Sequence, residues 1–77
     1  MMPKAYVTVV TAAGMSPEVI EELFDIPEVV DAHIVAGNFD IIAELDAEET
    51  SDLLPIVTRR IQGIEGVGHT RTYIVLE

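Results

Sequence analysis

The fold of this chain is decided at its middle, where the sequence reads Val35-Ala36-Gly37-Asn38-Phe39-Asp40-Ile41-Ile42-Ala43-Glu44-Leu45. Gly37 and Asn38 both tolerate a positive φ and together favour a tight turn. Two strand-like runs, Val29 to Ala36 and Phe39 to Asp46, flank this pair. The pattern therefore predicts a β-hairpin with these runs as its two strands.

Both runs alternate in the way that strands with one covered face do. In the first run Val30, Ala32 and Ile34 alternate with Asp31, His33 and Val35. In the second run Ile41, Ala43 and Leu45 alternate with Asp40, Ile42 and Glu44. One face of this hairpin is thus expected to lie against a core.

Before the hairpin, the sequence predicts a strand and then a helix. Lys4 to Thr11 is rich in β-branched residues, which favour a strand. Ser16 is a good N-cap and Pro17 suits the first helical position, so we expect a helix to begin there and to end before Pro27. Its apolar stripe consists of Val19, Ile20, Leu23 and Phe24.

After the hairpin, the polar segment from Asp46 to Thr50 leads into a second helix. Thr50 or Ser51 can cap it, Pro55 fits its first turn, and it runs to about Gln62. Its apolar side, with spacings of three and four, consists of Leu53, Val57, Ile61 and Ile64. Gly63 and Gly66 bracket the exit from this helix, and Val67 to Leu76 supplies a last strand.

The element order is β-α-β-β-α-β, which predicts an α+β, ferredoxin-like sandwich formed by residues 1–77 as a single domain. Right-handed crossovers place both helices on one face of a four-stranded antiparallel sheet with strand order 4-1-3-2. The other face is left uncovered. We expect it to carry Tyr6, Thr8, Val10, His33, Val35, Ile42 and Glu44. This mixture suits packing on a second copy, so the chain is expected to form a homo-oligomer, at least a dimer.

Composition excludes several classes of protein. The 77 residues contain no cysteine, which removes disulfides and thiolate metal sites, and the formal net charge of −10 opposes direct contact with nucleic acid. A single lysine among scattered acids suggests a halophilic protein, adapted to concentrated salt. No apolar stretch approaches the roughly 18 residues of a membrane span, so we expect a cytoplasmic protein.

The sequence offers no catalytic or cofactor-binding constellation. His33 and His69 lie on different predicted strands without a third ligand, and Ser16 and Ser51 are interpreted as helix caps. We therefore expect no enzyme, no metal and no cofactor. The pair Arg59-Arg60 could bind an anion, but on an amphipathic helix such a pair is more often part of a solvated face or in an ion pair, here with Glu48, Glu49 or Asp52.

Three segments of the sequence are more specific indicators of a protein family than the features described so far. The hairpin contains Gly37-Asn38-Phe39-Asp40, the second helix leads into Ile61-Gln62-Gly63-Ile64-Glu65-Gly66-Val67, and Thr70-Arg71-Thr72-Tyr73-Ile74-Val75-Leu76 follows. In order and spacing, nearly the whole chain resembles the effector-binding (RAM) domain of the Lrp/AsnC family of transcriptional regulators. That family has a G-x-[YF]-D hairpin, an I-x-G-V step and a last strand with T-x-T. Its full-length members also carry an N-terminal helix-turn-helix, which is missing here, so this chain looks like a stand-alone version of the domain.

The resemblance implies a function. RAM domains dimerise through their sheets, assemble further and bind amino acids between dimers. On this chain, the implied effector site is formed by Gly37, Asn38, Phe39 and Asp40 of the hairpin, with Thr70 and Thr72 from a neighbouring subunit. Asp40 would accept hydrogen bonds from an α-amino group. Any contact with DNA would come through a full-length Lrp/AsnC partner.

Two other readings stay open at this point. One is an ACT-like amino-acid-binding regulatory module, which shares the β-α-β-β-α-β plan. The other is a small dimeric enzyme of the ferredoxin-like, α+β-barrel type, which would use His33 or His69 near the sheet interface. The hairpin residues also have purely structural roles, because a turn needs Gly37-Asn38 and Asp40 can cap it. The sequence does not name the effector.

Overall fold

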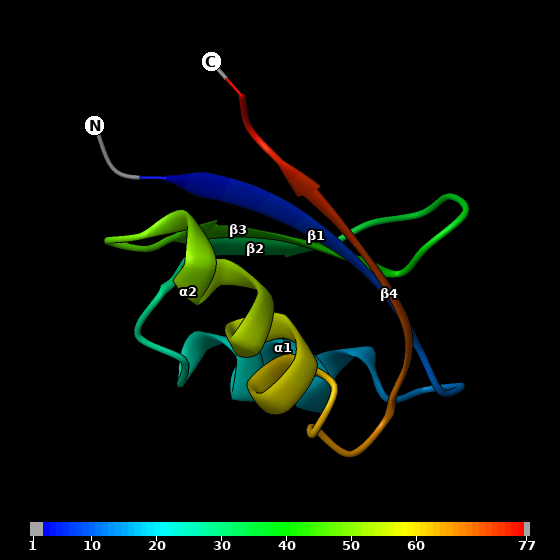
Figure 1. Cartoon of the computed structure of the whole chain (residues 1–77). Helices are drawn as coiled ribbons and strands as arrows, with labels where there is room; N and C mark the ends of the chain where they lie inside the picture. Colours follow the sequence, from blue (N-terminus) through cyan, green and yellow to red (C-terminus); the bar gives the residue numbers. More distant parts are fainter. Residues whose placement is uncertain (1–2, 77) are drawn as a thin grey trace.

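A computed structural model describes residues 3–76 and confirms the predicted order of elements (Figure 1). The elements are β1 (Lys4–Thr11), α1 (Ser16–Phe24), β2 (Val29–Ile34), β3 (Ile41–Asp46), α2 (Thr50–Pro55), a π-helical segment η1 (Ile56–Ile61) that continues α2, and β4 (Val67–Ile74). The class is α+β and ferredoxin-like, as the sequence predicts.

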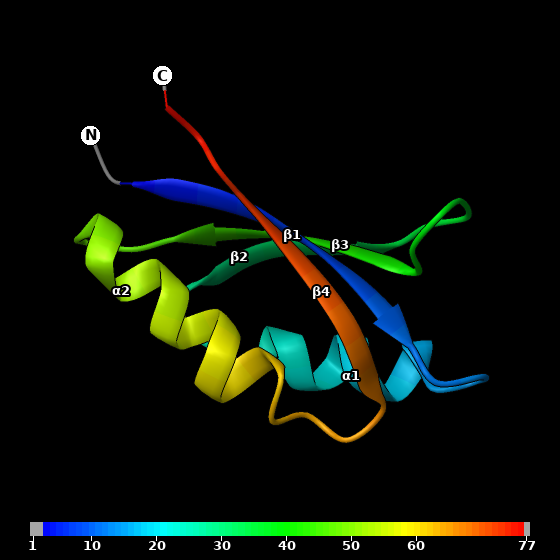
Figure 2. The same cartoon turned by 45° about the vertical axis from the view of Figure 1, so that its right-hand side comes forward.

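The four strands form one antiparallel sheet in the order β2-β3-β1-β4, which is the predicted order. Both helices lie on the same side of this sheet, as Figures 1 and 2 show from two directions. We call the covered side the helix face and the other side the open face. β1 is a central strand, and β2 and β4 are the two edges.

The core lies between the helix face and the helices. Strand residues at alternate positions fill one side of it, and the predicted stripes of the two helices fill the other. Its members with no exposed surface are Ala5, Val7, Val9, Val19, Leu23, Ile41, Leu45, Leu53 and Ile61. The alternation in β1 and β3 therefore predicts the buried face correctly.

The predicted tight turn at Gly37-Asn38 is wrong. Among residues 3–76 only Gly14 and Gly66 have a positive φ, so neither turn residue adopts the left-handed conformation. β2 ends earlier and β3 begins later than expected. The connection is therefore a longer loop, Val35–Asp40, closed by a bond from the Val35 N–H to the Asp40 carbonyl at 2.8 Å. A loop of this length reverses the chain without a left-handed residue. We call Val35–Asp40 the hairpin loop.

The predicted helix starts are also displaced. Ser16 is the first residue of α1 and caps nothing; its hydroxyl instead pairs with that of Thr11 at 2.8 Å. Thr50 is likewise inside α2, whose N-cap position is Glu49, without a side-chain cap bond. Pro55 lies at the end of α2 rather than in its first turn. Pro55 has no N–H to donate to the helix, and the π-helical hydrogen bonding begins directly after it, at Ile56.

The edge strands depart from the predicted alternation. A register shift between Val29 and Asp31 leaves Val30 52% exposed, and Ile34, at the end of β2, is 51% exposed. Phe24, assigned to the apolar stripe of α1, is also exposed and is the last residue of that helix. β4 ends at Ile74 and not at Leu76.

The two adjacent leucines of α2 provide a test of this packing. Leu53 is fully buried, whereas Leu54 is 59% exposed. Leu53→Ala should lower the free energy of unfolding by about 2 to 5 kcal/mol, because it removes buried methyl groups and leaves a cavity. Leu54→Ala makes the same change in side chain and helix propensity at the surface, and should cost no more than about 0.5 kcal/mol. Urea denaturation measures both, and equal losses would contradict the arrangement of this helix.

Candidate functional site

The candidate site is the hairpin loop, which the fold attaches to the end of β1. The Asp40 N–H donates to the Val9 carbonyl at 2.9 Å. The Asp40 carboxylate oxygen Oδ2 in turn accepts a bond from the Thr11 N–H at 2.9 Å, with the Thr11 hydroxyl at 3.4 Å. The Thr11 hydroxyl also pairs with that of Ser16. A chain of hydrogen bonds thus joins the loop, the end of β1 and the start of α1.

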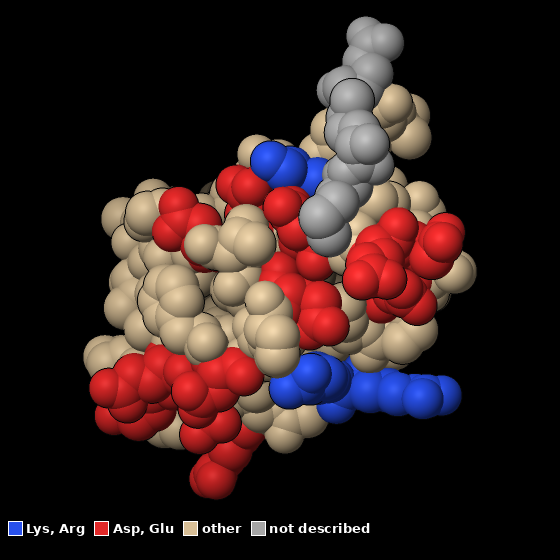
Figure 3. All heavy atoms as spheres, turned by 90° about the vertical axis from the view of Figure 1, so that its left-hand side faces the viewer, with Lys and Arg blue, Asp and Glu red and all other residues tan. Residues whose placement is uncertain are grey.

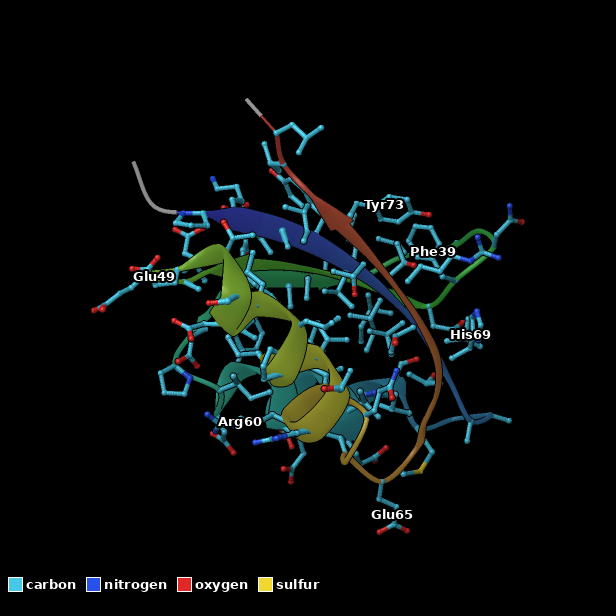
Figure 4. The ribbon with its side chains drawn as sticks, in the orientation of Figure 1. Phe39, Glu49, Arg60, Glu65, His69 and Tyr73 are labelled. Atoms are coloured by element: carbon cyan, nitrogen blue, oxygen red, sulfur yellow. The ribbon has the colours of Figure 1, made fainter. Side chains whose placement is uncertain are left out.

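These bonds hold the Asp40 side chain in place but do not use all of its acceptor positions. A carboxylate has two oxygens with about four acceptor positions. The contacts with Thr11 use one oxygen, so the other retains the capacity to accept bonds from a ligand. Asp40 and Phe39 are partly buried, while Gly37 and Asn38 are exposed. Figure 4 shows Phe39 at the end of the sheet where the hairpin loop lies.

The two predicted threonines lie elsewhere. Thr70 is opposite Val9 and Thr72 is opposite Val7, both of which are buried under the helices, so both threonines are on the helix face of β4. The Thr70 hydroxyl accepts a bond from the Gln62 amide at 2.8 Å. β4 and β3 flank β1 on opposite sides, which separates Thr70 from Asp40 by two strand spacings, about 10 Å. One chain alone therefore does not bring the six predicted site residues together.

The open face is a mixed surface, as the sequence predicts. Cross-strand pairs place Tyr6 between Glu44 and Tyr73, and Thr8 between Ile42 and Arg71. Tyr6 and Tyr73 are exposed, and Ile42 is partly buried. A hollow of about 190 Å³ on this face is lined by Tyr6, Asp31, His33, Ile42, Ala43 and Glu44. The face thus offers apolar and polar groups side by side.

The open face also carries charge. The Lys4 ammonium lies 2.8 Å from the Glu44 carboxylate, and this hydrogen bond raises the pKa of Lys4 above its usual value. His33 Nε2 lies 3.2 Å from Asp31 Oδ2 at the exposed edge of the same face. His69 is opposite Val10 on the far edge strand. Within residues 3–76, no three His, Asp or Glu side chains are grouped so that they could hold a metal ion.

The prediction for the arginine pair was partly wrong. Arg60 Nη1 lies 3.7 Å from Glu28 Oε1, and Glu28 was not among the predicted partners. Glu28 precedes β2, far from Arg60 in the sequence, and only the packing of the second helix beside this segment brings the two together. Nor did the sequence indicate that Thr11 would bind Asp40, because no local pattern links residues so far apart. The only feature of the sequence that could have suggested the bond between Thr11 and Asp40 was the polar end of the predicted first strand.

Comparison with known proteins places these features in a family. The sequence profile of the Lrp/AsnC ligand binding domain matches residues 4–77. The uncharacterised HTH-type transcriptional regulator PF0250 of Pyrococcus furiosus is 39% identical over 57 residues, which are 74% of this chain and 38% of that protein. The HTH-type transcriptional regulator FL11 of the same organism is 32% identical over 76 residues, 95% of this chain and 48% of FL11.

A solved structure extends the likeness to three dimensions. The crystal structure of FFRP-DM1 has a TM-score of 0.92 and 35% identity, and the match covers 97% of this chain and 100% of that one. By contrast, this chain spans less than half the length of the two curated regulators. In the part of the chain that the structure describes, no helix is long and apolar enough to cross a membrane.

The bond between Thr11 and Asp40 predicts a structural cost at the candidate site. Asp40→Ala should lower the free energy of unfolding by about 1 to 3 kcal/mol, because the partly buried Thr11 N–H loses a charged acceptor. Asp40→Asn keeps a side-chain oxygen and should lose less. Urea denaturation at one protein concentration compares the two variants. If Asp40→Ala were as stable as the unmodified chain, the bond would have no structural role.

Proposed function

The chain belongs to the family of Lrp/AsnC ligand-binding domains, and on that premise we propose that it senses an amino-acid-like effector and self-associates to do so. It is a regulatory domain of the kind found in transcriptional regulators. In this proposal it catalyses no reaction. The observation that carries the proposal is the Asp40 carboxylate: Thr11 binds its Oδ2, and no hydrogen bond from residues 3–76 to its other oxygen is seen.

Self-association is proposed to occur through the open face. A monomer of this size buries only part of its apolar surface, and its sheet is covered by helices on one side alone. The uncovered side combines Tyr6, Tyr73 and Ile42 with charged groups, a mixture that resembles a protein interface more than a freely solvated surface. A second copy is the natural partner, because two identical faces can pack symmetrically.

The effector site is proposed to lie outside this sheet-to-sheet contact. Thr70 and Thr72 are on the helix face of an edge strand, so a partner packed on the open face would leave them accessible. They could therefore meet the hairpin loop of a subunit from a different dimer. In such a site Asp40 binds the effector's ammonium group, and the exposed backbone at Gly37 and Asn38 approaches its carboxylate.

Contact with DNA is proposed to be the task of a full-length family member that assembles with this domain. Residues 3–76 contain the seven elements described above and no helix-turn-helix among them. The formal net charge of −10 would repel a phosphate backbone. The domain would then act on transcription through the assembly it joins.

Light scattering coupled to size exclusion tests the proposed interface. The unmodified chain should elute as a dimer or larger species at micromolar concentration, in low and in high salt. Ile42→Glu should shift it toward monomer, because it places a new charge in the middle of the open face. Leu54→Glu introduces the same charge on the opposite layer and should leave the assembly unchanged. A monomeric unmodified chain would contradict this part of the proposal.

Binding of the effector is tested first by a thermal-shift screen of the twenty amino acids at molar salt, then by calorimetry on any that bind. Asp40→Asn should weaken binding by about 1 to 3 kcal/mol, because it removes the charge that pairs with the ammonium group. Asparagine retains an acceptor for Thr11, so this variant separates binding from folding. Glu65→Gln, on the loop before β4, is the matched control. Absence of binding by all twenty, or equal binding by Asp40→Asn, would contradict the site.

A further inference from the structure

The charged side chains of the open face are divided between its two edges. Asp31 lies on the edge strand β2, opposite Glu44 of β3. Arg71 lies on the other edge strand, β4, opposite Thr8 of β1. The Glu44 carboxylate is already paired with Lys4 at 2.8 Å. One edge of the open face is therefore acidic at Asp31, and the other edge is basic at Arg71.

These two edge residues do not pair with each other in one chain. Among residues 3–76, Arg71 forms no ion pair, and the Asp31 carboxylate contacts the Ala32 N–H at 2.9 Å and His33 Nε2 at 3.2 Å. Arg71 is exposed, and the Asp31 side chain is 57% exposed. Three strand spacings, about 14 Å, separate the two edges, which is too far for an arginine side chain to span.

A hollow beside Asp31 suits a guanidinium group. It has a volume of about 190 Å³, and its walls include the Tyr6 ring, Ile42 and the Asp31 carboxylate. A guanidinium group binds a carboxylate through parallel N–H donors and also stacks on aromatic rings. The hollow offers a carboxylate and a ring together, so an arginine from outside the chain can use both.

The register of the sheet shows which orientation of a second copy brings an arginine there. One row across the four strands consists of His33, Ile42, Thr8 and Arg71. Two open faces can stack with their strands aligned about a two-fold axis in two ways. An axis across the strands places each edge strand over itself. An axis along the strands, between β1 and β3, places β4 of one copy over β2 of the other and lays this row on its own reverse.

Charge distinguishes the two orientations. The chain has four Lys and Arg against fourteen Asp and Glu, and Figure 3 shows acidic side chains over much of the side that it faces, with basic side chains at few places. Two such chains repel each other, so a stable contact requires a cation to meet a carboxylate. An axis across the strands places Asp31 near Asp31 and Arg71 near Arg71. An axis along the strands places each near the opposite charge.

We propose that two copies stack open face to open face about an axis along the strands, so that Arg71 of each copy enters the hollow of the other and pairs with Asp31. This inference rests on the proposed self-association and adds the orientation of the copies and the ion pair that sets it. Because the contact is symmetric, two identical pairs form, one at each side of the interface.

An exchange of charges tests the ion pair. Analytical ultracentrifugation in low salt, where screening is weak, measures the dissociation constant for self-association. Asp31→Arg and Arg71→Asp should each raise it at least about tenfold, because each places like charges opposite each other. The double variant Asp31→Arg/Arg71→Asp restores opposite charges and should return to within about threefold of the unmodified chain. Circular dichroism verifies that the variants fold.

The sign of the effect separates the ion pair from general repulsion. Asp31→Arg makes the net charge less negative, so general repulsion predicts tighter association, whereas the ion pair predicts weaker association. Asp25→Arg and Arg59→Asp make the same changes in net charge at exposed positions of the helix layer. Asp25→Arg should not weaken association, and Arg59→Asp should weaken it less than Arg71→Asp. Tighter association of Asp31→Arg, or a double variant no better than the single ones, would overturn the proposal.

Because the sequence contains no cysteine, introduced cysteines can report the orientation directly. A short bismaleimide bridges the roughly 10 Å between stacked sheets. An equal mixture of Asp31→Cys and Arg71→Cys chains should yield a covalent dimer that contains one of each, and neither variant alone should yield one. Absence of this mixed product would overturn the orientation. A monomeric unmodified chain would contradict the proposed self-association itself, whereas a dimer that fails these tests would contradict only the present inference.

Discussion

Two helices can cover only one face of a four-stranded sheet, and the rest of this structure follows from that constraint. The odd-numbered residues from Ala5 to Val9 in β1 and from Ile41 to Leu45 in β3 are buried on the covered face, where they complete the core with Leu23 and Leu53. The open face cannot be buried by the same chain. Its side chains are accordingly a compromise, apolar enough to pack and polar enough to remain hydrated, which is the basis of the proposal that a second copy covers it.

The same constraint explains why functional groups gather at the ends of the sheet. Backbone groups at the ends of strands have no ladder partner, so side chains and neighbouring loops must satisfy them. At one end, Asp40 satisfies the N–H of Thr11 and thereby ties the hairpin loop to the central strand. At the other end, the Asp46 N–H reaches the Glu28 carbonyl and brings two carboxylates to the border of a groove. Structural requirements have thus placed a carboxylate at each end.

Much of the fold could be predicted from the sequence, because strand alternation and helical spacing are local patterns that each reflect one covered face. The positions of Ile41, Ala43 and Leu45 follow from period two alone. The turn at Gly37-Asn38 was predicted wrongly, because turn residues permit a left-handed conformation without requiring it, and the anchoring of Asp40 on β1 decides the shape of the loop instead. The contact of Asp40 with β1 thus outweighed the turn propensity of Gly37-Asn38.

The candidate sites could be predicted less well, for the same reason. The resemblance indicated the hairpin, but it did not indicate that Asp40 accepts a hydrogen bond from Thr11. Likewise, no sequence pattern joined Glu28 to Asp46 and Arg60. The bond from the Thr11 N–H holds Asp40 in place in this structure, so the proposed ligand would meet a preorganised carboxylate and lose little free energy to ordering it.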